Sequence, residues 1–257
     1  HSSLHCARRA YLKAIKGFPN TSVTSDATVA THCVTLPELK RTPKLMVALN
    51  CGVKYVVTEQ WIKDCVKAKA LVEVVKPADA APAKKAKKSS ATVVEDDRAD
   101  PELVKQLQAS PYIVQDADKE KLWGFSMATT LAIPRNTHAV KLFEKMCFFC
   151  TKGVCGETAP PADELSTIIQ SGGGVWLNSL DEWAEYSSGG KGKSKADGEV
   201  HSLVVISHAN VVKKEVNKKV LDAISKGDPE TSGVYSIELV FQACLKQRVE
   251  FEAHQLK

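Results

Sequence analysis

The sequence predicts an α/β protein built from two similar units, each with a parallel sheet flanked by helices. Short apolar, β-branched segments alternate with amphipathic segments of helical spacing, which is typical of parallel strands joined by helical crossovers. The same order of segments occurs twice, on either side of a helical stretch near the middle of the chain. Of the 257 residues, 44% are hydrophobic, which is enough for one large or two small domains.

The first unit is predicted over residues 1–75. Its opening residues carry no apolar signal-peptide core, and we expect that its first strand has been cut into. Gly17 and Gly52 each follow an apolar helical pattern, as glycines that end helices do, and Pro43 suits a first helical turn. In chain order, the expected elements are a helix over 7–17, strands over 21–25 and 31–36, a helix over 42–52, a strand over 54–58 and a helix over 59–72.

The second unit is predicted over residues 142–257 and repeats this order. Val212, Val216 and Val220 share one helical stripe, which Gly227 closes. The expected elements are a strand over 145–154, a helix over 162–174, strands over 175–180 and 201–208, a helix over 211–227, a strand over 233–237 and a helix over 238–251.

Three segments separate or interrupt the units. Residues 76–110 are predicted to be a low-complexity insertion, because their first part is rich in Ala, Pro, Lys and Ser. Residues 111–141 are predicted to link the repeats, with an edge strand at Ile113 and a helix over 121–133. Residues 187–199 are rich in Gly, Ser and Lys and are predicted to be a flexible insertion within the second unit.

Several classes of protein are disfavoured by what the sequence lacks. No run of about 18 apolar residues predicts a membrane span. The glycine-rich phosphate loops, the nucleophile elbow and the zinc-protease motif are missing, and the seven histidines are scattered. We therefore expect neither an enzyme nor a cofactor, and we expect a monomeric module. The eight cysteines lie mostly in apolar segments, which is typical of reduced thiols in the cytosol or nucleus.

Two other functions stay open at this point. Cys147, Cys150 and Cys155 give a zinc site three ligands, but a structural zinc needs four and no matching second pair follows. A strand that packs in the core is the better interpretation of the first two cysteines. The net charge of +5 and the basic clusters would allow nucleic-acid binding with a steep salt dependence.

Three stretches of the sequence carry a family resemblance. Residues 31–49 combine a strand, a basic loop and a helix with an R-T-x-K pattern, and residues 56–73 include the helix expected around Trp61. Together with residues 112–127, they resemble the tandem BRCT repeats of checkpoint-mediator and tumour-suppressor scaffolds, closest to the mediator of DNA damage checkpoint family. The second repeat is less similar, because Leu239 stands at the place of the usual Trp. The resemblance implies two small parallel four-stranded sheets flanked by helices and packed through a helical linker.

The resemblance also implies a phosphate-binding site in the first repeat. A phosphoserine brings about two negative charges and three strong acceptor oxygens. By resemblance, Ser2 supplies a hydroxyl, Ser3 a backbone N–H and Lys44 an ammonium to one phosphate. Thr42 is similar to the residue that caps the second helix, and it supports Lys44 rather than binding the phosphate.

The residues implied in peptide specificity lie in both repeats. Arg41 corresponds to a residue that contacts the peptide after the phosphoresidue, and Thr151, Lys152 and Gly153 are expected to form the other wall of that pocket. Trp61 is implied to be a structural core residue.

The expected partner is a phosphorylated protein or peptide, with a histone tail as one candidate. The expected setting is a nuclear scaffold in DNA-damage signalling on chromatin. The alternatives are a kinetochore or other chromosome-segregation scaffold, and a BRCT module that binds DNA.

Overall fold

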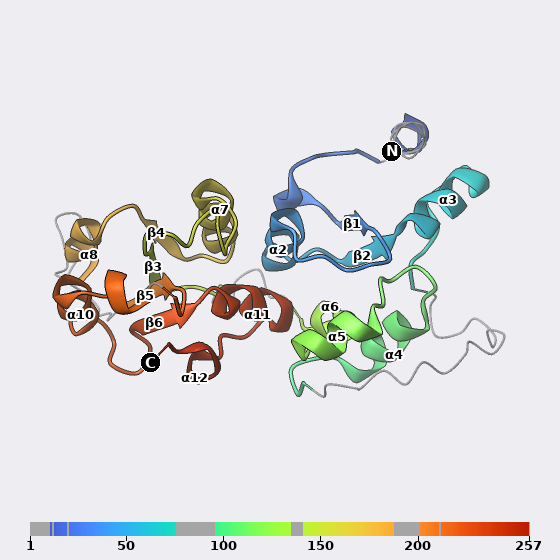
Figure 1. Cartoon of the computed structure of the whole chain (residues 1–257). Coiled ribbons are helices and arrows are strands. Elements are labelled where there is room, and N and C mark those ends of the chain that lie inside the picture. Colours follow the sequence, from blue (N-terminus) through green and yellow to red (C-terminus); the bar gives the residue numbers. More distant parts are fainter. Residues whose placement is uncertain are drawn as a thin grey trace, which may run out of the picture. The chain divides into compact units, whose positions relative to one another are not determined.

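The computed structural model describes residues 11, 13–19, 21–75, 96–134, 141–187, 201–210 and 212–256. The chain divides into two compact units (Figure 1). The first unit comprises His1–Lys40 and Cys51–Asn136, and the second comprises Arg41–Asn50 and Thr137–Lys257. Residues 41–50, which the sequence assigns to the first repeat, therefore pack within the second unit.

The first unit contains a parallel pair of strands, whose register places His32 beside Tyr55 and Thr35 beside Thr58. A single antiparallel bridge joins Val57 to Ile113, which agrees with the edge strand expected at Ile113. The elements of this unit are a 3-10 helix η1 (Ala27–Val29), strands β1 (His32–Thr35) and β2 (Tyr55–Thr58), and helices α3 (Glu59–Ala68), α4 (Pro101–Ala109), α5 (Ala117–Trp123) and α6 (Met127–Ala132).

The sheet of the first unit differs from the expected four strands. Among the described residues it has two, and residues 21–25 are not one of the others. The Thr21 hydroxyl instead donates to the carbonyls of Ile15 and Phe18, both at 2.7 Å, so the segment is held at the end of the preceding helical turn. Residues 11 and 13–15 are helical, as expected, and residues 7–10 and 12 of the predicted helix over 7–17 lie outside the described part of the chain.

The segments between the repeats contain more helix than expected. Helix α4 lies within the 76–110 stretch and is capped by Asp100, whose carboxylate accepts from two backbone N–H groups. The single helix expected over 121–133 is two helices, because Gly124 adopts the left-handed conformation (φ 62°) and ends α5. Ser126 then caps α6. Residues 76–95 and 135–140 lie outside the described part of the chain.

The second unit has the four-stranded parallel sheet that the sequence predicts, in the order β4-β3-β5-β6. Its strands are β3 (Met146–Cys150), β4 (Val175–Leu177), β5 (Ser202–Ser207) and β6 (Gly233–Ser236). Its helices are α2 (Pro43–Asn50), α7 (Ala162–Ser171), α8 (Leu180–Ser187), α9 (Val212–Glu215), α10 (Lys218–Ile224), α11 (Glu238–Lys246) and α12 (Phe251–His254).

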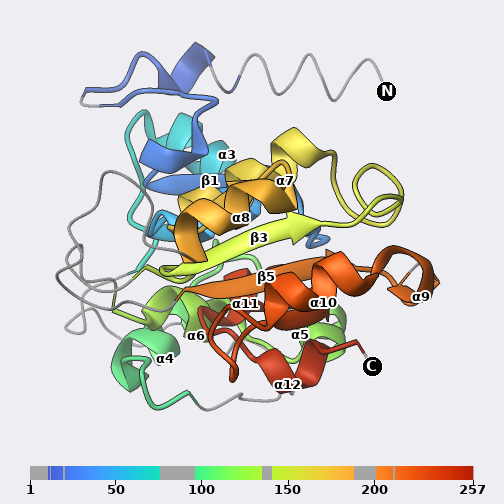
Figure 2. The ribbon, with the colours of Figure 1, turned by 90° about the vertical axis from the view of Figure 1, so that its left-hand side faces the viewer.

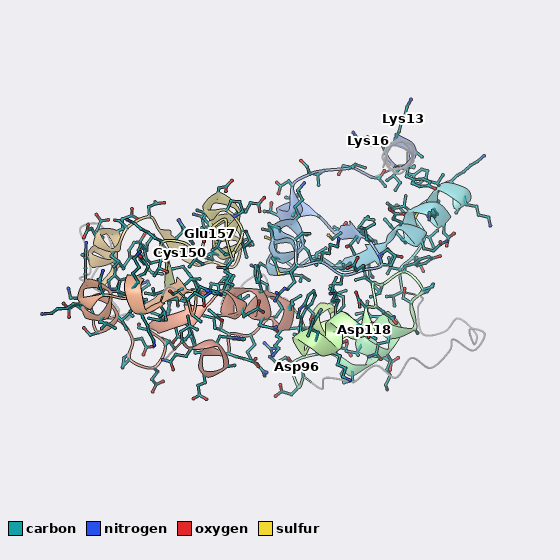
Figure 3. All side chains as sticks on the ribbon, viewed as in Figure 1. Lys13, Lys16, Asp96, Asp118, Cys150 and Glu157 are labelled. Atoms are coloured by element: carbon teal, nitrogen blue, oxygen red, sulfur yellow. The ribbon has the colours of Figure 1, made fainter. Side chains whose placement is uncertain are left out.

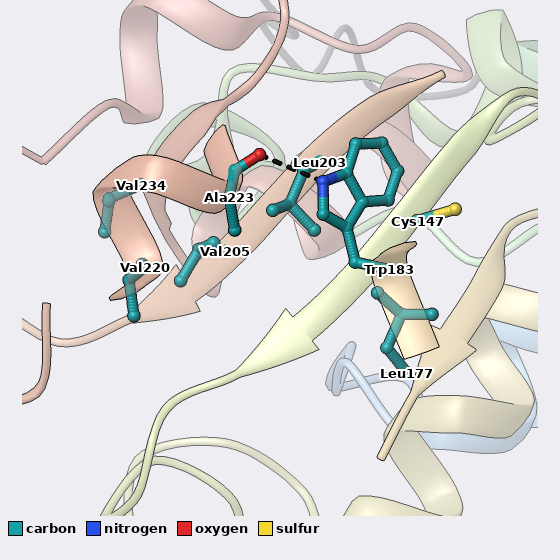
Figure 4. Packing of buried hydrophobic residues seen from close by; sticks show 8 residues of the cluster. All are labelled: Cys147, Leu177, Trp183, Leu203, Val205, Val220, Ala223 and Val234. Carbon is teal, nitrogen blue, oxygen red and sulfur yellow. Dashed lines mark hydrogen bonds between the residues drawn. The ribbon is translucent and has the colours of Figure 1, made fainter. Parts of the chain in front are cut away.

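One face of this sheet packs under α8 and α10, the helices nearest the viewer in Figure 2. Trp183 of α8 is fully buried in this layer, and its indole Nε1–H donates to the carbonyl of Ala223 in α10 at 2.9 Å (Figure 4). Because side chains alternate along a strand, Cys147 points into this layer while Phe148 points to the other face. There the ring of Phe148 packs edge-on against Phe143 at 5.2 Å.

Helix α2 is held by α7 and α11 of the second unit. Five consecutive residues from Leu45 to Leu49 are buried. At its carboxyl end, the Asn50 Nδ2 donates to the carbonyl of Ile168 at 2.9 Å and to the Ser171 hydroxyl at 3.1 Å. These contacts fix the position of the helix that carries Lys44.

The second unit departs from the expected elements at two helices. The helix expected over 211–227 is split into α9 and α10, because the Asn217 side chain accepts from Val220 N–H and starts a new helix. The helix expected over 238–251 ends at Lys246, since Gln247 is left-handed (φ 52°). Most of the predicted insertion at 187–199 lies outside the described residues. None of the helices in the described ranges is both long and apolar enough to cross a bilayer.

Candidate functional site

The amino end of α2 is a positively charged spot on the second unit. Thr42 starts the helix, with its hydroxyl accepting from Leu45 N–H at 3.3 Å and its carbonyl accepting from Met46 N–H at 3.1 Å. Lys44 lies in the first turn and is exposed, and the turn contains no acidic residue. Thr42 thus stands at the start of the helix, and its supporting role for a phosphate ligand stays a prediction.

Lys44 sits where a cation is intrinsically unfavourable. The helix dipole places partial positive charge at the amino end, so an ammonium in the first turn is repelled. Lys44 forms no ion pair with any of the described residues. A bound anion would be attracted by both the ammonium and the helix terminus. Ser2 and Ser3, the other predicted phosphate ligands, lie outside the described residues, so their distance from Lys44 stays a prediction.

Arg41 is held by an acidic residue that the sequence did not single out. Its guanidinium donates to both carboxylate oxygens of Glu238, with N–O distances of 2.5 and 2.9 Å. The same guanidinium lies 4.8 Å from the ring centre of Phe241, one turn further along α11. Glu238 in turn occupies the first turn of α11, where the dipole favours a carboxylate. This two-point pair fixes the backbone just before α2 against α11.

The sequence does contain a signal for this partner of Arg41. Glu238 is an acidic residue in the first turn of a predicted helix, directly before Leu239. Leu239 itself is 1% exposed, so it fills the core in place of the usual Trp. The role of Arg41 in peptide specificity stays a prediction.

The other predicted wall of the specificity pocket begins where β3 ends. Thr151 is buried, and its hydroxyl donates to the Ser207 hydroxyl at 3.0 Å. Lys152 and Gly153 are exposed, and Gly153 is in the left-handed region (φ 75°), where glycine is favoured. The Thr151 side chain is therefore committed to the neighbouring strand β5, while the two exposed residues face solvent. That these residues share one pocket with Arg41 stays a prediction.

Trp61 is a core residue, as the sequence predicts. It is 4% exposed, its Nε1–H donates to the carbonyl of Val72 at 2.8 Å, and its ring stacks on His32 at 4.6 Å. Burial among these groups lowers the pKa of His32, so the imidazole favours its neutral form.

The cysteine pattern does not assemble a metal site in the part of the chain that the structure describes. Cys147 and Cys150 are three residues apart on one strand, so their thiols lie on opposite faces of the sheet. Cys147 belongs to the core around Trp183. Cys150 instead meets Cys155, with a sulfur–sulfur distance of 3.0 Å.

Comparison with known proteins decides the family of the second unit. The sequence-family model of the BRCT domain matches residues 141–254. Residues 141–254 are a BRCT domain. This agrees with the four-stranded parallel sheet of the unit and with the resemblance seen in the sequence. BRCT domains are in general interaction modules rather than enzymes, and no enzyme family is matched.

The described part of the chain matches a tandem BRCT fold. It is similar to the crystal structure of the BRCT5-BRCT6 domains of Brc1 from S. pombe, with a TM-score of 0.57 and 20% sequence identity. The similarity covers 94% of this chain and 88% of that chain. A comparison with curated protein sequences finds no match. At this identity, the solved structure establishes the fold.

Proposed function

We propose that this chain is a scaffold module that recognises phosphoserine or phosphothreonine in a partner protein, with Lys44 as its principal phosphate ligand. The observation that carries the proposal is the exposed Lys44 ammonium in the first turn of α2, a turn without a compensating acid. Thr42 starts the helix and Asn50 anchors its other end, so the lysine stands on a fixed support.

A phosphate suits this position better than a single-charge anion. At neutral pH it carries about two negative charges, which pair with the ammonium and with the partial charge of the helix end. By resemblance to tandem BRCT repeats, the Ser2 hydroxyl and the Ser3 backbone N–H complete the phosphate site. Arg41, Thr151, Lys152 and Gly153 then read the residues that follow the phosphoresidue, as their counterparts do by resemblance.

The proposed setting is the nucleus, with DNA-damage signalling on chromatin as the first candidate. A phosphorylated histone tail is one partner of suitable chemistry. The alternative setting is a kinetochore or another chromosome-segregation scaffold, in which the same phosphate pocket would bind the partner. Binding of nucleic acid is secondary in this proposal.

A phosphopeptide library tests the proposal. An immobilised serine- and threonine-directed library is divided, one half is treated with phosphatase, and retention of the chain on each half is compared. We expect retention on the phosphorylated half alone, and a loss of at least about tenfold for Lys44→Ala, since removing a charge-assisted contact costs on the order of 1.5–3 kcal/mol.

Lys105→Ala is the matched control, because Lys105 is also an exposed lysine on a helix, with a side-chain exposure of 74%. Equal retention of the wild type on both halves would contradict the proposal. Preferential retention on duplex DNA with a steep salt dependence would replace it with nucleic-acid binding.

A further inference from the structure

Two cysteines of the second unit, Cys150 and Cys155, have their thiols in contact with each other and not around a metal site formed by described residues. Cys150 is the last residue of β3 (Figure 3), and Cys155 lies in the loop that follows. Their sulfur atoms are 3.0 Å apart and share a hydrogen bond. Both side chains are partly exposed, so a small reagent can reach them. Both cysteines are free thiols in this structure.

The loop between the two cysteines is anchored on both sides. Thr151 N–H donates to the carbonyl of Ile206 at 2.9 Å, which continues the sheet past the end of β3. Val154 is fully buried, and its carbonyl accepts from the N–H groups of Thr158 and Ala159, both at 3.0 Å. Because each cysteine adjoins an anchored residue, the approach of the two sulfurs follows from the fold of the loop.

The hydrogen bond between the thiols makes them chemically unequal. Once one thiol ionises, the remaining proton is shared between the sulfurs. This sharing lowers the pKa of Cys155 and, with burial, raises the pKa of Cys150. Cys155 is therefore the stronger candidate for the thiolate, which is the reactive form towards oxidants.

We propose that Cys150 and Cys155 form a reversible, peroxide-responsive disulfide, a modification site on the loop after β3. The Cys155 thiolate attacks one oxygen of hydrogen peroxide, the O–O bond breaks, and the sulfur becomes a sulfenic acid while hydroxide leaves and takes up a proton as water. The Cys150 thiol then attacks that sulfur, which forms the S–S bond and releases a second water. In total, two thiols lose two hydrogen atoms and one peroxide becomes two waters.

The geometry favours the second step over further oxidation. A disulfide bond needs a sulfur–sulfur distance of about 2.05 Å, so the sulfurs have to approach by about 1 Å from their present contact. An adjacent resolving thiol captures the sulfenic acid before a second peroxide does. The resulting ring encloses Thr151, Lys152, Gly153 and Val154.

Mass spectrometry of the oxidised chain tests the site. The purified chain is treated with a small excess of hydrogen peroxide, remaining thiols are blocked with N-ethylmaleimide, and the protein is digested with trypsin. Cleavage at Lys152 separates the two cysteines into the peptides 146–152 and 153–191. We expect these peptides to be joined by a disulfide, with Cys147 alkylated after unfolding, and to separate on treatment with dithiothreitol.

Three variants make the assignment specific. Cys150→Ser and Cys155→Ser should each abolish the linked pair, and Cys155→Ser should also remove the sulfenic acid trapped by dimedone. Cys51→Ser, which removes an exposed thiol of the first unit, should leave the linked pair unchanged. The proposal is overturned if both thiols of the wild type stay fully alkylated by N-ethylmaleimide after peroxide treatment, or if the linkage joins either cysteine to another partner. Neither result depends on phosphopeptide binding.

Discussion

The pair between Arg41 and Glu238 provides the sharpest test of how α2 is held. Two N–H groups of one guanidinium meet the two oxygens of one carboxylate at 2.5 and 2.9 Å. The side chains of Arg41 and Glu238 are 22% and 39% exposed, so solvent screens the pair only in part. The perturbation is the pair of single variants Arg41→Ala and Glu238→Ala together with the double variant.

The size of the coupling follows from this geometry. A fully exposed ion pair contributes about 0.2–1 kcal/mol, and a hydrogen bond to a charged group about 1.5–3 kcal/mol. Because Glu238 is more than one third exposed, solvent weakens the pair. We therefore expect a coupling free energy of about 1 kcal/mol, at the top of the range for exposed ion pairs and below the range for a hydrogen bond to a charged group. Arg41→Ala should lower the free energy of unfolding by about 1.5–2 kcal/mol, since it also removes the contact with Phe241, at about 0.5–1 kcal/mol.

Urea unfolding of the four proteins measures this coupling as a double-mutant cycle. Circular dichroism and tryptophan fluorescence should give coincident transitions before free energies are extracted. Arg41→Lys is the matched control, because it keeps the charge but cannot make the two-point contact, and its coupling to Glu238 should fall below about 0.5 kcal/mol. If the effects of the two alanine variants add to within about 0.3 kcal/mol, Arg41 and Glu238 do not stabilise each other and the prediction is wrong.

Two further predictions concern the core and the pH dependence of stability. Gly172→Ala should lower the free energy of unfolding by about 1–3 kcal/mol, measured by urea unfolding, because an added Cβ lies 2.4 Å from the buried ring of Phe143; an unchanged stability would show that the ring can move. Hydrogen bonds from Lys246 and Arg248 hold the pKa of Glu250 below its ordinary value, so this carboxyl contributes stability above its unfolded pKa and loses it as the pH falls through its folded pKa. When the unfolding temperature is measured at a series of acidic pH values, it should therefore fall less steeply for Glu250→Gln than for the wild type. An identical fall in both proteins would contradict this.

The sequence predicts the second unit well because its strands are nearly continuous apolar runs. Strand β5 is buried along its whole length, and such an apolar run is typical of a central parallel strand. The breaks within helices were missed because they depend on local caps. Asn217 fits a helix interior as far as spacing is concerned, yet its side chain starts a new helix. Gly124 ends α5 by a left-handed conformation that an apolar pattern does not reveal.

The site was predictable only as far as residue type and position along α2. Thr42 and Lys44 lie at the helix start, where the R-T-x-K pattern places them. The partner of Arg41 was not predictable, because Glu238 is 197 residues away along the chain. The contact between Cys150 and Cys155 was missed for a different reason. The C-x-x-C spacing draws attention to Cys147, but alternation along β3 turns that thiol into the core.

The most direct test of phosphate recognition is calorimetric titration of one peptide in its phosphorylated and unphosphorylated forms. The peptide is the strongest binder from the library, and the titrations use the wild type, Lys44→Ala and Lys105→Ala. We expect the phosphorylated form to bind the wild type and Lys105→Ala, with a Kd at least about tenfold higher for Lys44→Ala, and we expect no measurable heat with the unphosphorylated form. Equal affinity of the wild type for both forms would contradict it.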